Sequence, residues 1–203
     1  AKNILAPSGL LHKCIQGQQF PTLGLGTFGL YGASCRKAVC YALGVGYRHI
    51  DTARIYENEG AVGLGIWDSG LERSDLFITS KVWWQDLAPA KIRSEVDASL
   101  EELQTDYLDL ALIHWPNPEF SIQQAIETLA ERKALGKIRF YGVSNFTPSL
   151  FNEAVGYGEI FCNQVEYHPL LDQSRLLDRV RSHDSALIAY CPLAQGTLAG
   201  ESE

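Results

Sequence analysis

The chain has 203 residues, of which 46% are hydrophobic and 20% charged, and its formal net charge is −7 at pH 7. This length suits one domain with a single core, and the composition is ordinary for a soluble globular protein. The negative charge argues against nucleic acid or an anionic membrane as a partner, because both select a basic surface. We therefore expect a single domain over residues 1–203.

The cysteines and the N-terminal segment bear on location. The five cysteines are odd in number and form no CxxC pair, which favours reduced thiols over a disulfide framework or a zinc site. No apolar run reaches transmembrane length, and residues 1–20 lack the apolar segment and cleavage site of a signal peptide. We therefore expect a cytoplasmic protein with no metal site.

The predicted elements start with a short hairpin over residues 8–20, whose turn we place at Gly17 and Gln18. From residue 23 onward, short apolar runs alternate with amphipathic stretches, which is the pattern of strands followed by helices. The predicted strands cover residues 23–28, 47–50, 75–79, 108–113, 138–143, 161–165 and 186–190.

Helices are predicted between these strands. Ser34 is the expected N-cap of the first helix. Ser121 and Gln124 form a capping-box pattern before a later helix that Gly136 ends. A helix is also predicted over 151–155. Two further helices follow from apolar positions on one face, namely Ile92, Val96, Leu100 and Leu103 in one, and Leu176, Leu177 and Val180 in the other.

Regular alternation of strand and helix predicts a parallel sheet, either doubly wound or closed into a barrel. Residues 24–29, GLGTFG, match the GxGxxG dinucleotide fingerprint, and Asp51 follows at a suitable distance for a ribose-binding acid. Two features argue against this doubly wound reading. Pro21 interrupts the first strand, and the expected N-cap Ser34 starts the helix after the glycines, whereas the fingerprint needs the helix N-terminus at the pyrophosphate.

A barrel explains the polar residues at the ends of the predicted strands better than a doubly wound sheet does. Polar side chains follow each strand from the second to the seventh, namely Asp51, Tyr56, Lys81, His114, Ser144, Asn145, Gln164, Glu166 and Tyr190. The carboxyl ends of the strands of a (β/α)₈ barrel form one face, and that face carries the active site. We therefore expect an α/β fold of the TIM-barrel type, preceded by a β-hairpin.

Seven motifs, in their order and spacing, resemble the aldo-keto reductase family: GLGTF, GYRHIDTARIYENE, LFITSKVW, LIHWP, GVSNF, NQVEYHP and YCPL. The resemblance covers residues 14–200. The spacing of the motifs resembles that of the compact bacterial, 2,5-diketogluconate reductase-like members, which reduce keto sugars and small aldehydes. It implies a TIM barrel, NADP(H) as cofactor, a small carbonyl substrate and a monomeric protein.

The resemblance also implies a mechanism for reducing a carbonyl group. Tyr56 is the general acid, Lys81 lowers its pKa, Asp51 pairs with Lys81, and His114 orients the carbonyl oxygen. A phenol with a pKa near 10 is a slow proton donor unless a neighbouring positive charge stabilises its phenolate. Each residue alone has a structural explanation, such as a surface lysine or a core histidine. The four residues together favour a catalytic site.

Further residues are expected to hold the cofactor and the substrate. Ser144, Asn145 and Gln164 would bond the nicotinamide carboxamide, and Tyr190 would stack on its ring. The ribose and pyrophosphate contacts are expected from Thr27, Asp51, Leu193, Gln195 and Gly196. The substrate pocket is expected to have apolar walls formed by Phe28, Trp83 and Trp115. We expect His49 to be structural, and Arg54 and Glu57 to be solvated.

The sequence departs from the family in length. Family members continue through another helix, an eighth strand and a C-terminal tail that carries the motif for the 2′-phosphate of NADP(H). We therefore expect the chain to belong to a longer protein of roughly 260 to 280 residues, since a typical barrel has about 250. The preference for NADPH over NADH then follows from the family alone.

Two other functions stay open. A barrel metal hydrolase could use His49, Asp51, His114 and His168 around zinc, although Lys81 beside that site argues against it. A barrel that binds the cofactor without catalysis, as a sensor or regulatory subunit, is the second. The complete set of four catalytic groups argues against this alternative.

Overall fold

The computed structural model describes residues 12–200. It opens with a two-stranded antiparallel hairpin, β1 (His12–Ile15) and β2 (Gln18–Pro21). The turn lies at Gln16 and Gly17, one residue earlier than predicted, and both residues have positive φ, 48° and 75°. Two consecutive residues of this kind match the twist of a two-residue hairpin. The part of the predicted hairpin over residues 8–11 lies outside the described residues.

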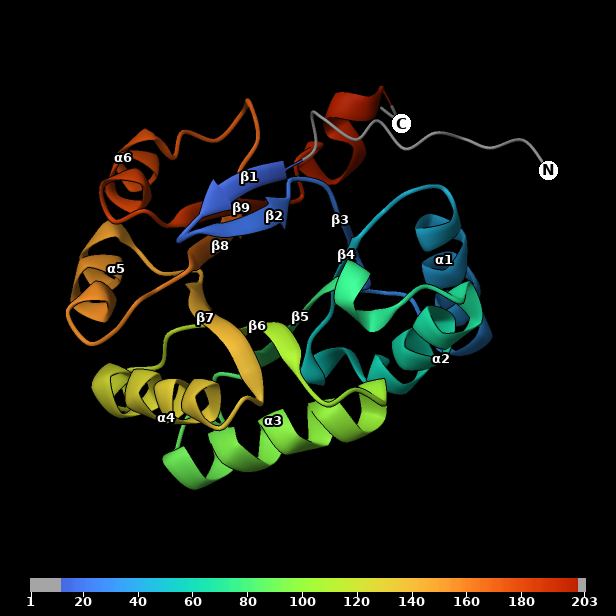
Figure 1. Cartoon of the computed structure of the whole chain (residues 1–203). Coiled ribbons are helices and arrows are strands. Elements are labelled where there is room, and N and C mark those ends of the chain that lie inside the picture. The colour runs from blue at the N-terminus through green and yellow to red at the C-terminus, as the bar shows by residue number, and fades with distance from the viewer. Residues whose placement is uncertain (1–11, 201–203) are drawn as a thin grey trace.

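Seven parallel strands follow and pair with one another in chain order. They are β3 (Gly24–Gly26), β4 (His49–Asp51), β5 (Phe77–Val82), β6 (Leu108–Ile113), β7 (Ile138–Ser144), β8 (Cys162–Glu166) and β9 (Ala186–Tyr190). A doubly wound sheet reverses its strand order at a switch point, and this sheet has none. The sheet instead curls into a nearly closed barrel (Figure 1), which confirms the predicted fold class.

In the described part of the chain, six α-helices form an arc outside the strands (Figure 1). They are α1 (Gly32–Gly44), α2 (Glu59–Ser69), α3 (Pro89–Leu103), α4 (Ile122–Ala134), α5 (Pro148–Val155) and α6 (Ser174–Ser182). Three short 3₁₀ segments complete the connections, namely η1 (Arg54–Tyr56), η2 (Arg73–Asp75) and η3 (Ala194–Ala199). Across residues 12–200, none of the helices has the length and apolarity needed to cross a membrane.

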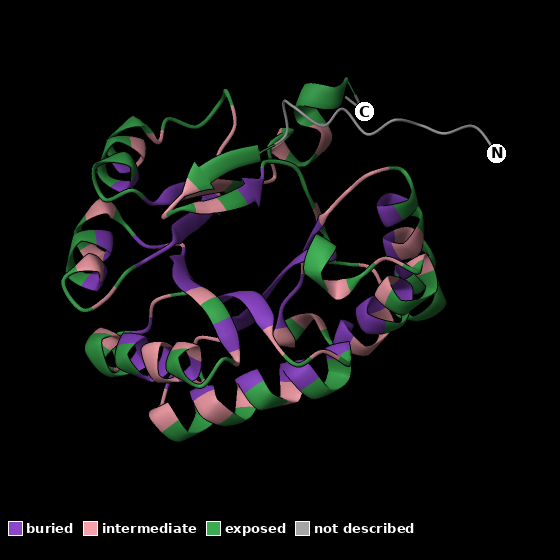
Figure 2. Cartoon of the chain, in the orientation of Figure 1, coloured by how far each residue is buried: buried purple, intermediate pink, exposed green. Residues whose placement is uncertain are grey.

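The helix signals in the sequence are mostly confirmed. The four apolar positions predicted on one face of α3 are all buried, and Figure 2 shows buried residues on the inner sides of the helices. Ser121 Oγ accepts a hydrogen bond from the Gln124 N–H at 3.3 Å and so caps α4. Gly136, with φ at 73°, follows this helix where the stop was predicted.

Several local predictions differ from the structure. The strands predicted over 23–28 and 47–50 are Gly24–Gly26 and His49–Asp51. The first helix has Tyr31, not Ser34, at its N-cap, and the Ser34 hydroxyl donates to the Tyr31 carbonyl oxygen at 2.7 Å from inside the first turn. The strand predicted over 75–79 starts at Phe77, because Asp75 ends the 3₁₀ turn η2, and it continues to Val82.

Strand alternation divides the core into two regions. On β6, Leu110 and Leu112 belong to a cluster inside the barrel, whereas Ala111 and Ile113 belong to the larger cluster that includes the buried faces of the helices. Successive side chains of a strand point to opposite faces, so this division follows from the strand geometry. Phe20 of the hairpin joins the inner cluster, where its ring packs against Phe77 at 4.9 Å between centroids. The hairpin therefore closes the amino-terminal end of the barrel.

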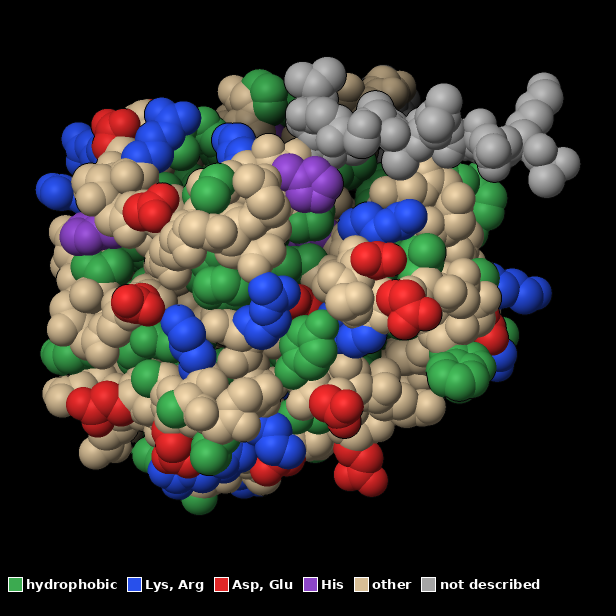
Figure 3. Space-filling view, viewed as in Figure 1, with side chains coloured by type: hydrophobic (Ala, Val, Ile, Leu, Met, Phe, Trp, Pro, Cys, Tyr) green, Lys and Arg blue, Asp and Glu red, His purple; other side chains and the backbone are tan. Residues whose placement is uncertain are grey.

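The surface carries charges of both signs. On the face seen in Figure 3, Lys and Arg side chains are interspersed with Asp and Glu side chains. This mixture agrees with the modest negative net charge of the whole chain.

Candidate active site

A cavity of about 1160 Å³ runs along the open side of the sheet, from the hairpin residues Ile15 and Phe20 to the carboxyl ends of the strands. Its walls include these predicted site residues: Thr27, Phe28, Asp51, Tyr56, Trp83, His114, Trp115, Ser144, Asn145, Gln164, Tyr190 and Gln195. The barrel thus brings together residues that are up to 168 positions apart, counting from Thr27 to Gln195 (195 − 27). Leu193 and Gly196 are not among the lining residues, and Leu193 is 57% exposed.

Lys81 is buried inside the barrel, beside Asp51 of the cavity wall, and is not itself among the lining residues. It points inward because its neighbours Ser80 and Val82 on β5 face the helices. Its ammonium contacts Asp51 Oδ1 and donates to the Thr52 carbonyl oxygen at 2.9 Å. Burial alone would lower the pKa of Lys81, but the charge of Asp51 and hydrogen bonds to Asp51 and Tyr56 outweigh burial and raise it. Lys81 is therefore a buried, protonated cation.

Tyr56 lies directly above that cation. The Lys81 Nζ atom is 5.2 Å from the centroid of the Tyr56 ring. Burial raises the pKa of the Tyr56 hydroxyl above its usual value, while Lys81 counteracts this through its charge and a hydrogen bond. The influence of Lys81 has the expected direction, but the net pKa of Tyr56 is raised. Proton release from Tyr56 thus depends strongly on Lys81 staying charged.

His114 is the third ring of the group. Its centroid lies 5.7 Å from that of Tyr56 and 5.2 Å from that of Trp83, both at steep angles. Burial, helped by the charge of Lys81, lowers the pKa of His114 to about 3, so the imidazole is neutral near pH 7. Its Nδ1 atom is buried and finds no hydrogen-bond partner within residues 12–200.

A hydrogen-bond network joins β4, β7, β8 and β9 beside this group. Gln164 Nε2 donates to Asp51 Oδ2 at 2.7 Å, so both oxygens of the Asp51 carboxylate are bonded. The Ser144 hydroxyl donates to the Gln164 carbonyl oxygen at 2.8 Å. The Tyr190 hydroxyl donates to Asn145 Oδ1 at 2.8 Å. These polar groups are held in fixed orientations at one wall of the cavity.

The remaining predicted residues differ in exposure. Thr27 is fully buried, and its hydroxyl donates to the Asp51 carbonyl oxygen at 3.3 Å. Trp83 is only partly exposed, whereas Phe28 is 77% and Trp115 43% exposed. The Phe28 ring meets that of Tyr56 edge-on, with the centroids 5.2 Å apart. Phe28, Trp83 and Trp115 therefore contribute aromatic surface to the cavity walls, with Phe28 directly against Tyr56.

Two residues of the site were not identified from the sequence. Asn58 is the N-cap residue of α2, but its side chain caps nothing. Instead, Asn58 Nδ2 donates to the carbonyl oxygens of Thr27 and Leu30 at 2.8 and 2.9 Å, and Asn58 Oδ1 accepts from the Thr52 hydroxyl at 2.8 Å. It therefore ties the loop after β3 to the loop after β4. Cys191, which lines the cavity and has φ at 48°, is the second.

The structure supports the expected structural role of His49, but it contradicts the expected solvation of Arg54. His49 is buried below the site, with its Nε2 atom 2.9 Å from the Thr79 hydroxyl, as suits a structural residue. Arg54 is not solvated, because three carboxylates surround its guanidinium group. Glu57 is exposed, as expected.

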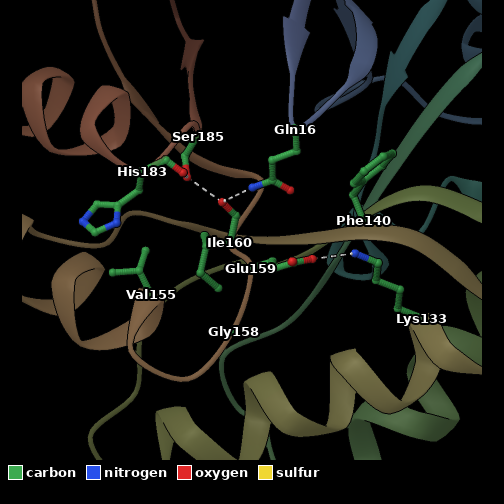
Figure 4. A pocket seen from close by; sticks show the side chains of 9 residues that line it. All are labelled: Gln16, Lys133, Phe140, Val155, Gly158, Glu159, Ile160, His183 and Ser185. Carbon is green, nitrogen blue, oxygen red and sulfur yellow. Dashed lines mark hydrogen bonds and ion pairs between the residues drawn. The ribbon is translucent and has the colours of Figure 1, made fainter.

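Two alternative sites are not supported. Within residues 12–200, no three His, Cys, Asp or Glu side chains are placed to hold a metal ion, so the proposed zinc ligands do not converge. A second cavity, of about 450 Å³, lies at the opposite end of the barrel (Figure 4). There the Ile160 carbonyl oxygen accepts from Gln16 and Ser185, and Lys133 pairs with Glu159 at 3.3 Å. These polar groups are thus already paired with one another.

The fold and the site together define a parallel barrel with a lysine-backed tyrosine and a neutral histidine at its carboxyl end. This arrangement can bind a carbonyl oxygen and protonate it. The sequence model of the aldo/keto reductase family matches residues 22–203, so the chain belongs to that family.

Individual relatives agree with this assignment. The chain is 43% identical over 186 residues to methylglyoxal reductase DkgB of Yersinia pestis, covering 89% of this chain and 70% of that protein. A solved structure of a putative 2,5-diketo-D-gluconic acid reductase B is 40% identical, with a TM-score of 0.88, and the match covers 91% of this chain and 66% of that one.

A further structure, of a Bombyx mori aldo-keto reductase in complex with NADP, is 32% identical with a TM-score of 0.83. The match covers 89% of this chain and 66% of that one. The chain thus spans 66–70% of the length of these three proteins.

Proposed function

We propose that the protein reduces aldehydes or ketones to alcohols with NADPH, and that Tyr56 is the general acid. The observation that carries this proposal is the buried Lys81 ammonium, paired with Asp51 and 5.2 Å from the Tyr56 ring. A lysine so deeply buried is costly unless it is paired, and perturbed ionisable groups in a cleft favour a catalytic site.

The cavity fits a nicotinamide cofactor. The part of the cavity at the carboxyl ends of the strands combines aromatic and polar side chains, as ligand sites commonly do. Tyr190 offers an aromatic face, and Ser144, Asn145 and Gln164 offer polar groups at the same wall. When bound, the nicotinamide supplies the hydride. The choice of NADPH over NADH is supported by the relative that binds NADP.

Each of the four central residues has a distinct role in this proposal. Neutral His114 orients the substrate by hydrogen-bonding its carbonyl oxygen. Tyr56 transfers its phenolic proton to that oxygen as negative charge develops there. Lys81 stabilises the resulting phenolate, and Asp51 keeps Lys81 charged and in place. General acid catalysis of this kind contributes about 10²- to 10⁴-fold to the rate.

Small dicarbonyl compounds and keto sugars are the proposed substrates. The relatives named above include a methylglyoxal reductase and a putative 2,5-diketo-D-gluconic acid reductase. Tyr56 itself lines the cavity together with the solvent-exposed rings of Phe28 and Trp115, so these rings are the apolar groups offered to such a substrate.

The oxidation of NADPH with methylglyoxal, and with an aromatic aldehyde, tests the proposal. We expect turnover with at least one of them, unchanged by a metal chelator. Loss of activity on chelation would favour a metal enzyme. Cofactor binding without any turnover would favour the regulatory barrel, the remaining alternative.

A further inference from the structure

The backbone that carries Tyr56 is short and makes few bonds of its own. Tyr56 ends the 3₁₀ turn η1, whose backbone bonds run from the Tyr56 N–H to Ala53 and from the Glu57 N–H to Arg54, at 3.0 and 3.2 Å. Glu57 then has φ at 52°, in the left-handed region. A three-residue turn of this kind is marginal alone, so side chains must fix its position.

Arg54, the first residue of this turn, binds three carboxylates on two helices. Its Nη1 atom lies 2.6 Å from Glu59 of α2 and 2.9 Å from Glu102 of α3. Its Nε atom donates to Glu95 of α3 at 2.9 Å. These bonds fasten the turn to the helices outside the barrel.

Glu59 extends the same network to the strand that carries Lys81. Its side chain is completely buried, and Oε1 accepts a hydrogen bond from the Ser80 hydroxyl at 2.5 Å. Ser80 precedes Lys81 on β5 and faces the helices, while Lys81 faces the inside of the barrel. Strand β5 therefore contacts the turn η1 in two ways. Ser80 reaches Arg54 through Glu59, and Lys81 lies against Tyr56.

We propose that Arg54 and Glu59 are positioning residues that hold Tyr56 at its working distance from Lys81 and His114. Neither residue lines the cavity, so they act on the reaction through η1. The burial of Arg54 is compensated by its hydrogen bonds to Glu59, Glu95 and Glu102, which raise the pKa of its guanidinium group. A planar guanidinium can bond several carboxylates at once, which a lysine ammonium does poorly. This inference rests on the proposed carbonyl reduction.

Paired substitutions avoid leaving the fully buried Glu59 charge without a partner, whereas Glu95 and Glu102 are in part exposed and keep contact with solvent. Arg54→Met with Glu59→Gln removes both charges, and such exchanges of buried ion pairs often preserve the fold. Arg54→Lys keeps the charge but cannot match the geometry. The control is Arg132→Met, because Arg132 is also a largely buried arginine that joins two helices, through Asp97 at 3.2 Å, and it lies away from η1.

We expect the double variant to lose about 10-fold or more in kcat with KM within about twofold, since small misplacements of reacting groups can cost up to about 10²-fold. The kcat of Arg54→Lys should lie between those of the double variant and the wild type. The kcat of Arg132→Met should equal that of the wild type. The alkaline limb of the kcat profile should move to higher pH in the double variant, because a Tyr56 farther from Lys81 has a higher pKa.

Amide hydrogen exchange provides a readout that does not depend on turnover. The Tyr56 and Glu57 amides should exchange at least about 10-fold faster in the folded double variant than in Arg132→Met. Unchanged exchange at these amides, or an unchanged kcat and pH profile in a variant of an active wild type, overturns the positioning role. An inactive wild type contradicts the proposed function instead, and the exchange result still decides whether Arg54 holds the turn.

Discussion

At the scale of the residue, the site is governed by the charge of Lys81. The same ammonium opposes the effect of burial on Tyr56 and helps keep His114 neutral, since its charge lowers the pKa of both groups. Asp51 is the counter-charge that keeps this lysine protonated. Asp51 is itself held by Gln164, which sequence reasoning had assigned only to the cofactor. One residue can therefore serve both the cofactor and the catalytic group.

Tyr190 has two separable contributions, its ring and its hydroxyl. We predict that Tyr190→Ala weakens NADPH binding, because an aromatic face beneath the nicotinamide is lost. Tyr190→Phe is the matched control, since it keeps the ring and removes only the bond to Asn145. A fluorescence titration gives both affinities. Equal affinities for the alanine variant and the wild type would remove Tyr190 from the cofactor site.

The buried histidine His49 makes stability depend on pH. Burial lowers its pKa from 6.5 to about 4, so the unfolded chain binds more protons than the folded protein between these values. The free energy of unfolding should therefore fall as the pH drops from about 6.5 to 4, by roughly 3 kcal/mol for this residue. Urea unfolding at several pH values measures the slope. His49→Gln should flatten it, and an unchanged slope would contradict the argument.

At the scale of the element, α2 is placed by glycines. A Cβ atom at Gly63 would come within 2.7 Å of the Leu103 carbonyl oxygen at the end of α3. At Gly65 it would meet the Arg36 carbonyl oxygen of α1 at 2.6 Å. The helix therefore approaches both neighbours at backbone distance, and α2 carries Glu59 of the network that holds Tyr56.

Two alanine substitutions in α2 should have opposite effects. Gly63→Ala should lower the free energy of unfolding by about 1–3 kcal/mol, because the added carbon overlaps backbone. Gly60→Ala meets nothing within 4 Å and should raise it, by up to about 1 kcal/mol, through its higher helix propensity. Denaturant unfolding of both variants checks the pair. A destabilised Gly60→Ala or a neutral Gly63→Ala would contradict the packing described here.

The strands and helices could be predicted from the sequence where the pattern is local. The strands over Leu108–Ile113 and Ala186–Tyr190 have the predicted bounds, since their runs are apolar apart from Asp109. The sequence predicts Asp75 in a strand, because nothing in its own neighbourhood shows that η2 ends there. It predicts a solvated Arg54, because the partners Glu95 and Glu102 lie 41 and 48 positions away (95 − 54 and 102 − 54) and only the fold brings them near.

At the scale of the whole molecule, the two ends of the barrel have different tasks. Phe20 and the hairpin close the amino-terminal end, and the polar groups gather at the carboxyl end. Within the described residues, β3 and β9 each pair with only one neighbouring strand, whereas β5, β6 and β7 lie in the middle of the sheet. Strands with an unpaired side are the least protected part of a sheet.

This arrangement predicts a gradient of amide hydrogen exchange. Amides of β6, which is buried along its whole length, should exchange slowest, and those of β3 and β9 should exchange faster. Exchange followed by mass spectrometry or NMR resolves the strands. If β9 were protected as strongly as β6, an additional partner would have to cover its free side.

Proton donation by Tyr56 to the substrate oxygen is the central claim, and the substitution Tyr56→Phe tests it most directly. The ring and its contacts with Phe28 and His114 remain, and only the hydroxyl is lost. Turnover of a carbonyl substrate should fall at least about 10²-fold, the usual scale for general acid catalysis, while NADPH affinity stays within about twofold. Near-normal turnover by Tyr56→Phe would contradict the mechanism.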